Sequence, residues 1–148
     1  MDKSQKAKEL FLSGYNCSQS VFGAFCEDFG IDFDSAMLIS SGFGGGMGRL
    51  REVCGAFSGI VLVLSLKYGY KNADDTEKKK DLYKHIQNLA TKFKQDNTSI
   101  ICKELLGMAA DKAPSPSQRT TEYYRKRPCP ELVAYAARIL DDYLNQDS

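Results

Sequence analysis

Five cysteines, at positions 17, 26, 54, 102 and 129, are the residues of this 148-residue chain whose types best suit chemistry. Thiolates act as nucleophiles and as ligands of soft metals, and structural disulfides are rare in a reducing compartment, so metal binding or thiol redox chemistry is favoured. The chain has no Cys-x-x-Cys pair, which excludes the thioredoxin signature, the zinc-ribbon spacing and covalent haem attachment. The cysteines can therefore share a site only if folding brings distant segments together.

A glycine-rich segment, GFGGGMGR at residues 42–49, precedes the third cysteine. Its glycines allow the backbone to approach a partner closely and leave amides uncovered by side chains. It lacks the Gly-Lys-Ser/Thr ending of a phosphate loop, and it lacks the preceding strand that a dinucleotide fingerprint requires. We predict cofactor-binding or anion-binding roles for its residues Gly44, Gly45, Gly46 and Arg49, with Arg51 as a further candidate cation.

An uncharged stretch follows at residues 53–66, which is shorter than the roughly 20 residues that span a bilayer. We therefore expect a buried central helix at about residues 50–68. Gly55 and Gly59 lie four residues apart near its beginning, so one sector of the helix has little side-chain bulk. Either another helix or a cofactor can approach this sector closely, and Gly55 is predicted to contact a cofactor.

Helical periodicity and capping residues indicate further helices on both sides of the central one. They are expected at residues 4–13, 17–29, 35–39, 75–93, 100–106 and 130–143, with capping boxes at Asn16 to Gln19 and at Asp74 to Glu77. Pro130 suits the first position of the last helix, which makes Cys129 its expected N-cap. Residues 108–128 contain three prolines and predict one long loop. The expected fold is an all-α compact bundle of six or seven helices that forms a single domain over residues 1–148.

In this arrangement four cysteines fall within the first turn of four different helices: Cys17, Cys54, Cys102 and Cys129. The free amides and partial positive charge of a helix N-terminus stabilise a thiolate. If the four N-termini converge, their amides can offset the charge of a tetrathiolate site. Cys26 lies half a revolution away from Cys17 on the same predicted helix, so we interpret it as a packing residue.

Composition excludes several other classes of protein. Apolar residues make up 43% of the chain, charged residues 26%, and the net charge is +1, which favours neither disorder nor nucleic-acid binding. The N-terminal residues lack the apolar core of an export signal, so a cytoplasmic location without a membrane span is expected. The basic second half of the 108–128 loop, which includes Arg119, is either a surface loop or a ligand-binding lid. His85, the single histidine, is more typical of a structural or exposed residue than of a catalytic one.

The chain resembles a family of redox-active proteins named for a Cys, Cys-Gly-Ala-x-x-Gly, Cys, Cys pattern. The resemblance covers nearly the whole chain and depends on motifs that occur together: Gly14-Tyr15-Asn16-Cys17-Ser18-Gln19, GFGGGMGR, Val53-Cys54-Gly55-Ala56-Phe57-Ser58-Gly59, Cys102-x-x-Leu105-Leu106-Gly107 and Cys129. It implies that the family's four cysteines are Cys17, Cys54, Cys102 and Cys129. A related domain in a split-Soret type of cytochrome is associated with a 2Fe-2S centre, which implies a cluster here without the haem.

We predict a small cytoplasmic redox protein whose candidate catalytic and metal-binding residues are Cys17, Cys54, Cys102 and Cys129. These would hold an iron-sulfur cluster, with a 2Fe-2S form implied by the resemblance, or another soft metal, for electron transfer or sensing. One alternative is a cluster-free protein in which two thiols cycle with a disulfide. Another is a non-redox protein that binds a small anion or carrier ligand. The sequence identifies no redox partner, and a homodimer is compatible with it.

Overall fold

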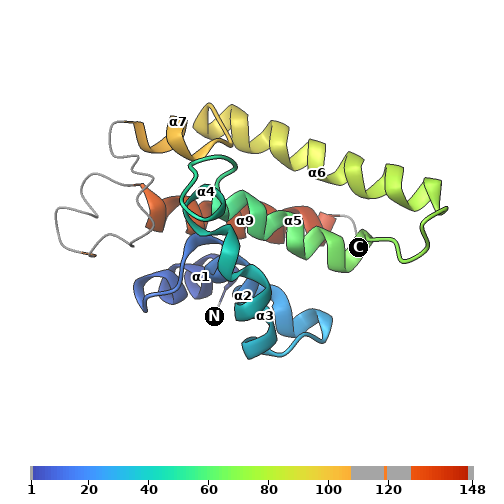
Figure 1. Cartoon of the computed structure of the whole chain (residues 1–148), viewed down its shortest axis with the longest axis horizontal. Helices are drawn as coiled ribbons and strands as arrows, with labels where there is room; N and C mark the ends of the chain where they lie inside the picture. The colour runs from blue at the N-terminus through green and yellow to red at the C-terminus, as the bar shows by residue number, and fades with distance from the viewer. Residues whose placement is uncertain (1, 108–118, 120–127, 147–148) are drawn as a thin grey trace.

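The computed structural model describes residues 2–107, 119 and 128–146, and these form a bundle of helices (Figure 1). In chain order the helices are α1 (Lys3–Leu12), α2 (Cys17–Phe25), α3 (Phe33–Ser40), α4 (Gly44–Met47), α5 (Gly55–Tyr68), α6 (Thr76–Asn97), α7 (Cys102–Leu106) and α9 (Cys129–Gln146). Two short 3-10 helices are η1 (Cys26–Phe29) and η2 (Ser41–Phe43). The described residues contain no strand, and an isolated antiparallel bridge joins Val53 to Ile101.

This architecture confirms the predicted all-α bundle. The one-turn α4 contains Gly45 and Gly46 in left-handed conformations, and without it the described residues hold seven α-helices, within the six or seven predicted. Helix α5 packs against α2, α6 and α9. Its Ile60, Val63 and Leu64 are fully buried, so the apolar stretch forms the centre of the core as expected.

The central helix begins five residues later than the predicted start at about residue 50. Arg49 and Arg51 have φ angles of 65° and 63°, which an α-helix does not allow. Segment 51–54 instead forms backbone hydrogen bonds with segment 100–103. This contact joins residues about 50 positions apart in the chain and sets where α5 begins.

The capping box predicted at the start of α2 is confirmed. The backbone amide of Gln19 donates to Asn16 Oδ1 at 2.9 Å, and the backbone amide of Asn16 donates to Gln19 Oε1 at 3.1 Å. The box predicted at the start of α6 is wrong by one residue, because Asp75 instead of Asp74 accepts from the backbone amide of Lys78. Either aspartate can satisfy an amide of the first turn, so spacing alone does not distinguish two adjacent acidic residues.

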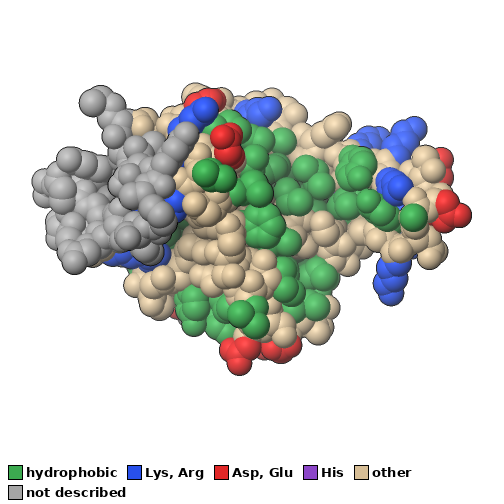
Figure 2. Space-filling view, in the orientation of Figure 1, with side chains coloured by type: hydrophobic (Ala, Val, Ile, Leu, Met, Phe, Trp, Pro, Cys, Tyr) green, Lys and Arg blue, Asp and Glu red, His purple; other side chains and the backbone are tan. Residues whose placement is uncertain are grey.

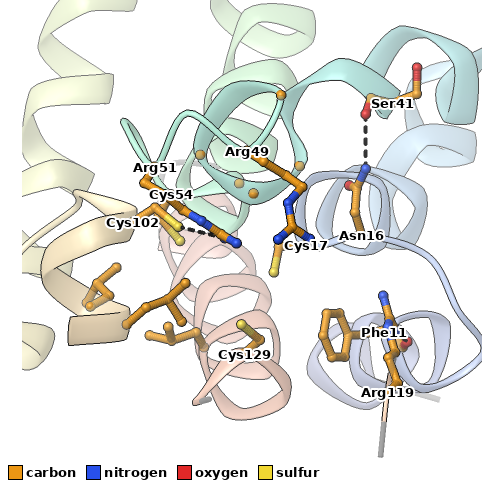
Figure 3. Close-up of a pocket in the computed structure, with 18 residues that line it drawn as sticks. Phe11, Asn16, Cys17, Ser41, Arg49, Arg51, Cys54, Cys102, Arg119 and Cys129 are labelled. Carbon is orange, nitrogen blue, oxygen red and sulfur yellow. Dashed lines mark hydrogen bonds between the residues drawn. The ribbon is translucent and has the colours of Figure 1, made fainter. Parts of the chain in front are cut away.

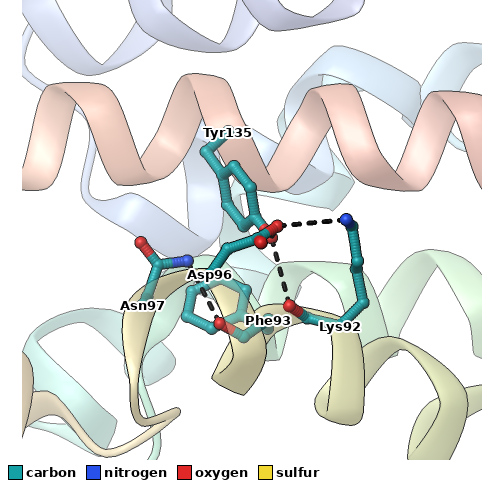
Figure 4. A network of polar contacts seen from close by, with 5 residues as sticks. All are labelled: Lys92, Phe93, Asp96, Asn97 and Tyr135. Carbon is teal, nitrogen blue, oxygen red and sulfur yellow. Dashed lines mark hydrogen bonds and ion pairs between the residues drawn. The ribbon is translucent and has the colours of Figure 1, made fainter.

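A polar network around Tyr135 joins α6 to α9 (Figure 4). The Tyr135 hydroxyl donates to the carboxylate of Asp96 and, at 3.3 Å, to the carbonyl of Lys92. Lys92 Nζ lies 3.3 Å from Asp96 Oδ2, and the Tyr135 ring packs edge-on against Phe93 with centroids 5.5 Å apart. The hydrogen bond from Tyr135 lowers the pKa of Asp96 from its usual value because it stabilises the ionised carboxylate.

We expect Tyr135→Phe to lower the melting temperature at neutral pH, because the variant lacks the hydrogen bond to ionised Asp96. A carboxyl whose pKa is lowered by folding stabilises the fold above its unfolded value of 3.8 and loses this contribution as the pH falls through the folded pKa. The difference between wild type and variant should therefore shrink below about pH 4. Thermal denaturation followed by circular dichroism at several pH values measures it. A difference that stays constant into acid would contradict this role.

His85 is a structural contact between α6 and its neighbours, in agreement with the interpretation preferred from the sequence. Its Nδ1 lies 2.5 Å from the Tyr143 hydroxyl and its Nε2 lies 3.4 Å from Asp81 Oδ1. The ring stacks on Tyr68 with centroids 3.8 Å apart. Tyr143 lies about 21 Å along α9 from Cys129, so this contact is remote from the cysteine at the start of that helix.

The surface shows no concentration of basic side chains on the described part of the face in Figure 2, where Lys and Arg are spread among hydrophobic and polar groups. This distribution agrees with the net charge of +1. Within the described ranges, no helix combines the length and the apolar character that crossing a bilayer requires. The apolar helix α5 has only 14 residues.

Candidate functional site

The four cysteines predicted to lie at helix starts line one cavity of about 330 Å³ (Figure 3). We refer to them as the cavity cysteines: Cys17 is the first residue of α2, Cys54 the N-cap of α5, Cys102 the first residue of α7 and Cys129 the first residue of α9. The predicted N-cap role of Cys129 is wrong by one residue, because the Leu132 amide donates to the Pro128 carbonyl and the helix already includes Cys129. Folding thus brings together four segments that are distant in sequence.

Cys54 and Cys102 are placed side by side by the pairing of their two segments (Figure 3). The backbone amide of Cys54 donates to the Ile100 carbonyl at 2.7 Å, and the amide of Cys102 donates to the Glu52 carbonyl at 2.6 Å. Both thiols are buried. The backbone, rather than the side chains, therefore determines that these two sulfurs face the same cavity.

Cys17 and Cys129 form the second neighbouring pair, where α2 packs against α9. The pKa of Cys17 is raised well above its usual value. The largest cause is a hydrogen bond with the Cys129 thiol, and the second is burial. The charges that the other cavity cysteines would carry act in the same direction. Without a cation to offset them, four thiolates in this cavity would repel one another.

Burial raises the pKa of Cys54 to about 12, because the charged thiolate would lose its hydration. The backbone amides of Phe57 and Ala56, in the first turn of α5, oppose this effect by stabilising the thiolate. Neither amide makes a regular capping hydrogen bond to Cys54. The predicted N-terminal effect is therefore present at this cysteine, but burial is the larger of the two effects.

The metal-free protein should accordingly react slowly with thiol reagents at Cys54. At neutral pH we expect its alkylation by iodoacetamide to be at least about 100-fold slower than in the urea-unfolded chain, because the thiolate is the nucleophile and is scarce. The rate should rise as the pH increases toward 12, the value to which burial raises the pKa. Mass spectrometry of peptides after timed alkylation measures this. A rate equal to that of the unfolded chain would show that the thiol is accessible and that folding does not raise its pKa.

The predicted glycines lie at this site, and each allows a close approach to another residue of it. A Cβ atom on Gly44 would lie 2.5 Å from Asn16 Nδ2, on Gly45 2.7 Å from Arg49 Cγ, on Gly46 2.7 Å from Cys102 Cβ and on Gly55 3.2 Å from Cys17 Cβ. Such distances are too short for any larger residue without displacement of the partner. These glycines therefore pack the protein around the cavity, in addition to lining it.

Among the described residues, three arginines line the cavity: Arg49, Arg51 and Arg119. Arg51 is only 3% exposed, and its Nη1 donates to Cys102 Sγ at 3.6 Å. The Arg119 guanidinium donates to the carbonyls of Phe11 and Tyr15 and lies 4.2 Å from the centre of the Phe11 ring. No carboxylate occurs among the described lining residues, so the cavity is electropositive before any thiol ionises.

From the sequence, Arg51 was predicted only as a further candidate cation, Arg119 only as part of a surface loop or lid, and Asn16 only as a helix cap. Asn16 also lines the cavity and donates from Nδ2 to the Ser41 carbonyl at 3.0 Å, which joins the start of α2 to the glycine-rich segment (Figure 3). The predicted loop at 108–128 lies outside the described residues except for Arg119 and Pro128. The feature of the sequence that could have identified Arg51 as a site residue is its position between the glycine-rich segment and Cys54.

Cys26 lies outside the cavity, as predicted. It is fully buried in η1, and its thiol donates to the Gly23 carbonyl at 3.6 Å. Burial raises the pKa of Cys26 from its usual value. It is a packing residue.

Comparison with known proteins agrees with the resemblance seen in the sequence. A family model described as "Putative redox-active protein (C_GCAxxG_C_C)" matches residues 15–143. No curated protein and no solved structure matches the chain. The matched range includes all four cavity cysteines and the whole glycine-rich segment, and the chain therefore belongs to this family of redox-active proteins.

Proposed function

We propose that this protein holds an iron-sulfur cluster on its four cavity cysteines and uses it for electron transfer or sensing. The observation that supports the proposal is that four thiols from four separate helix starts line one cavity with three guanidinium groups. Four thiolates are the usual ligand set of such clusters. A cluster held in this way is anionic, and positive groups in the cavity wall would stabilise it.

A single metal ion and a cluster place different demands on the positions of the four sulfurs. A structural zinc ion requires four ligands in a tetrahedron with Zn–S distances of about 2.3 Å. Among the described residues no group of three or more His, Cys, Asp or Glu side chains is arranged to hold one ion. A cluster divides its ligands among several iron atoms, so its cysteines need not converge on one point.

The chain's own residues contribute to this function in three ways. Each cavity thiol would lose a proton on ligation, which makes binding stronger as the pH rises. The amides of Ala56 and Phe57 would stabilise the thiolate of Cys54. Burial of Cys54 and Cys102 excludes water from one side of the site. A cluster bound there would accept and donate single electrons.

A second candidate function is supported by the contact between Cys17 and Cys129. Their thiols are hydrogen-bonded, and both residues are half-buried. In this function the two thiols form one disulfide and release two protons and two electrons to a disulfide acceptor, which becomes a dithiol. No cluster is needed. The raised pKa of Cys17 makes this reaction slow at neutral pH, so we rank it second.

A cytoplasmic location and a one-electron partner belong to the same proposal. Clusters and reduced thiols both fit a reducing compartment, and the chain has five cysteines. The partner would be another redox protein, because a cluster that transfers electrons needs a second protein that donates or accepts them.

Anaerobic purification followed by iron and sulfide analysis tests the proposal against its alternative. The cluster function predicts iron and acid-labile sulfide in near-equal amounts together with visible charge-transfer absorption. Colourless, metal-free protein with one disulfide that maps to Cys17 and Cys129 would favour the thiol function. Metal-free protein with no reversible disulfide would contradict both functions.

A further inference from the structure

Arg51 is a charged side chain buried beside the cavity cysteines. It is 3% exposed, and its Nη1 donates to Cys102 Sγ at 3.6 Å (Figure 3). A guanidinium group carries a positive charge, so Arg51 places that charge beside this sulfur. Because the group is buried, its effect on nearby charges is weakly screened by water and salt.

The backbone around Arg51 is held in an uncommon conformation that keeps the side chain in the cavity. Its φ angle is 63°, which is sparsely populated for residues other than glycine. The amide of Arg51 donates to the Gly45 carbonyl at 3.2 Å, and its carbonyl accepts from the Lys103 amide at 3.1 Å. A Cβ atom on Gly46 would lie 2.8 Å from the Arg51 Cα, so the two backbones are in direct contact.

The protein thus combines a strained backbone, a buried cation and a hydrogen bond to a candidate ligand sulfur at one position. Reduction potentials of iron-sulfur clusters depend on cluster type, net charge, hydrogen bonds to the sulfurs and solvent exposure. Arg51 acts on the net charge and on a sulfur hydrogen bond together. Arg49 and Arg119 add positive charge to the same cavity, and Arg119 directs hydrogen bonds to backbone carbonyls of Phe11 and Tyr15.

We propose that Arg51 raises the reduction potential of the cluster by stabilising its reduced state through Cys102. The proposal rests on the cluster function proposed above. In the reduction step one electron passes to the cluster from a one-electron donor of lower potential, and no proton is transferred. The added negative charge is favoured by the nearby guanidinium and strengthens the N–H···S hydrogen bond, because a charged acceptor makes a stronger bond. Arg51 is therefore a positioning residue for the redox reaction, because it acts through the Cys102 sulfur.

The test is a potentiometric titration of the cluster-loaded wild type and of the Arg51→Gln variant. In the cluster-loaded fraction of each protein we expect an equilibrium constant for reduction that is at least about tenfold smaller in the variant, which for a one-electron couple is a fall of about 59 mV. Arg51→Lys, which keeps the charge, should restore part of the difference. Arg119→Gln removes another cavity cation, whose guanidinium donates to the carbonyls of Phe11 and Tyr15, and should give a smaller fall.

If Arg51→Gln does not fold, the contact between Arg51 and the cluster can be measured on the wild type. Protein labelled with nitrogen-15 in its arginines should show, by pulsed electron paramagnetic resonance, a nitrogen coupling to the reduced cluster. Absence of that coupling, or an unchanged potential in loaded Arg51→Gln, would overturn the role of Arg51 and leave the cluster function intact. A protein that takes up no iron would overturn the cluster function and this inference with it.

Discussion

Serine in place of any one of the four cavity cysteines is expected to abolish iron binding, whereas Cys26→Ser should leave it unchanged. All four thiols line the same cavity, and a cluster needs all four sulfurs. A serine hydroxyl is a far weaker ligand for iron because it does not ionise near neutral pH. Iron and sulfide content of each anaerobically purified variant, with circular dichroism to verify folding, measures the effect.

Cys26→Ser is the matched control, because it makes the same chemical change outside the cavity. The Gly23 carbonyl, which accepts from the Cys26 thiol, is within reach of the new hydroxyl, so the cost in stability should be about 1 kcal/mol. If iron binding were lost only for two of the cavity variants, the protein would use a thiol pair instead of a tetrathiolate site. Loss of iron in Cys26→Ser with the fold intact would contradict the assignment.

Gly59→Leu is expected to disrupt the fold more than any other substitution considered. A Cβ atom at this position would lie 2.7 Å from Val21 Cβ and 3.1 Å from the carbonyl oxygen of Ser18, so α2 must move away from α5. Overpacking costs about 1 to 3 kcal/mol when side chains can adjust, and we expect more here because backbone lies in the way. Chemical denaturation measures the loss of stability.

Gly42→Ala is the matched control for this substitution. No heavy atom lies within 4 Å of a Cβ placed there, and the backbone is not left-handed, so the change should be within about 1 kcal/mol of neutral. Gly107 also has open space but a φ angle of 58°, which would strain any larger residue. Equal small effects of Gly59→Leu and Gly42→Ala would show that α2 and α5 do not cross closely.

Much of the fold was predictable because local signals agree with the tertiary structure. Asn16 and Gln19 form the capping box at the start of α2, and the uncharged stretch after Cys54 became the central helix. The sector of the central helix at Gly55 and Gly59 has little side-chain bulk, and from the sequence alone either another helix or a cofactor could contact it. The structure shows α2 against it, with Gly55 also at the cavity.

The cavity itself depends on contacts that local patterns do not encode. Segment 51–54 pairs with segment 100–103 through long-range backbone hydrogen bonds, and this contact shortens the predicted central helix. The left-handed backbone of Arg51 has no signal in its residue type, because only glycine adopts such angles readily. The positions of the cysteines at helix starts could therefore be predicted from the sequence, whereas the contact between Arg51 and the Cys102 sulfur could not.

Iron K-edge X-ray absorption of the anaerobically purified wild type tests the central claim most directly, because it reports the atoms around the metal. The account predicts iron surrounded by sulfur alone, with a second iron in the next shell, and loss of this signal in each cavity variant. Iron bound mainly through oxygen or nitrogen, or a lone metal ion without an iron neighbour, would contradict the claim that the four cavity cysteines hold one iron-sulfur cluster.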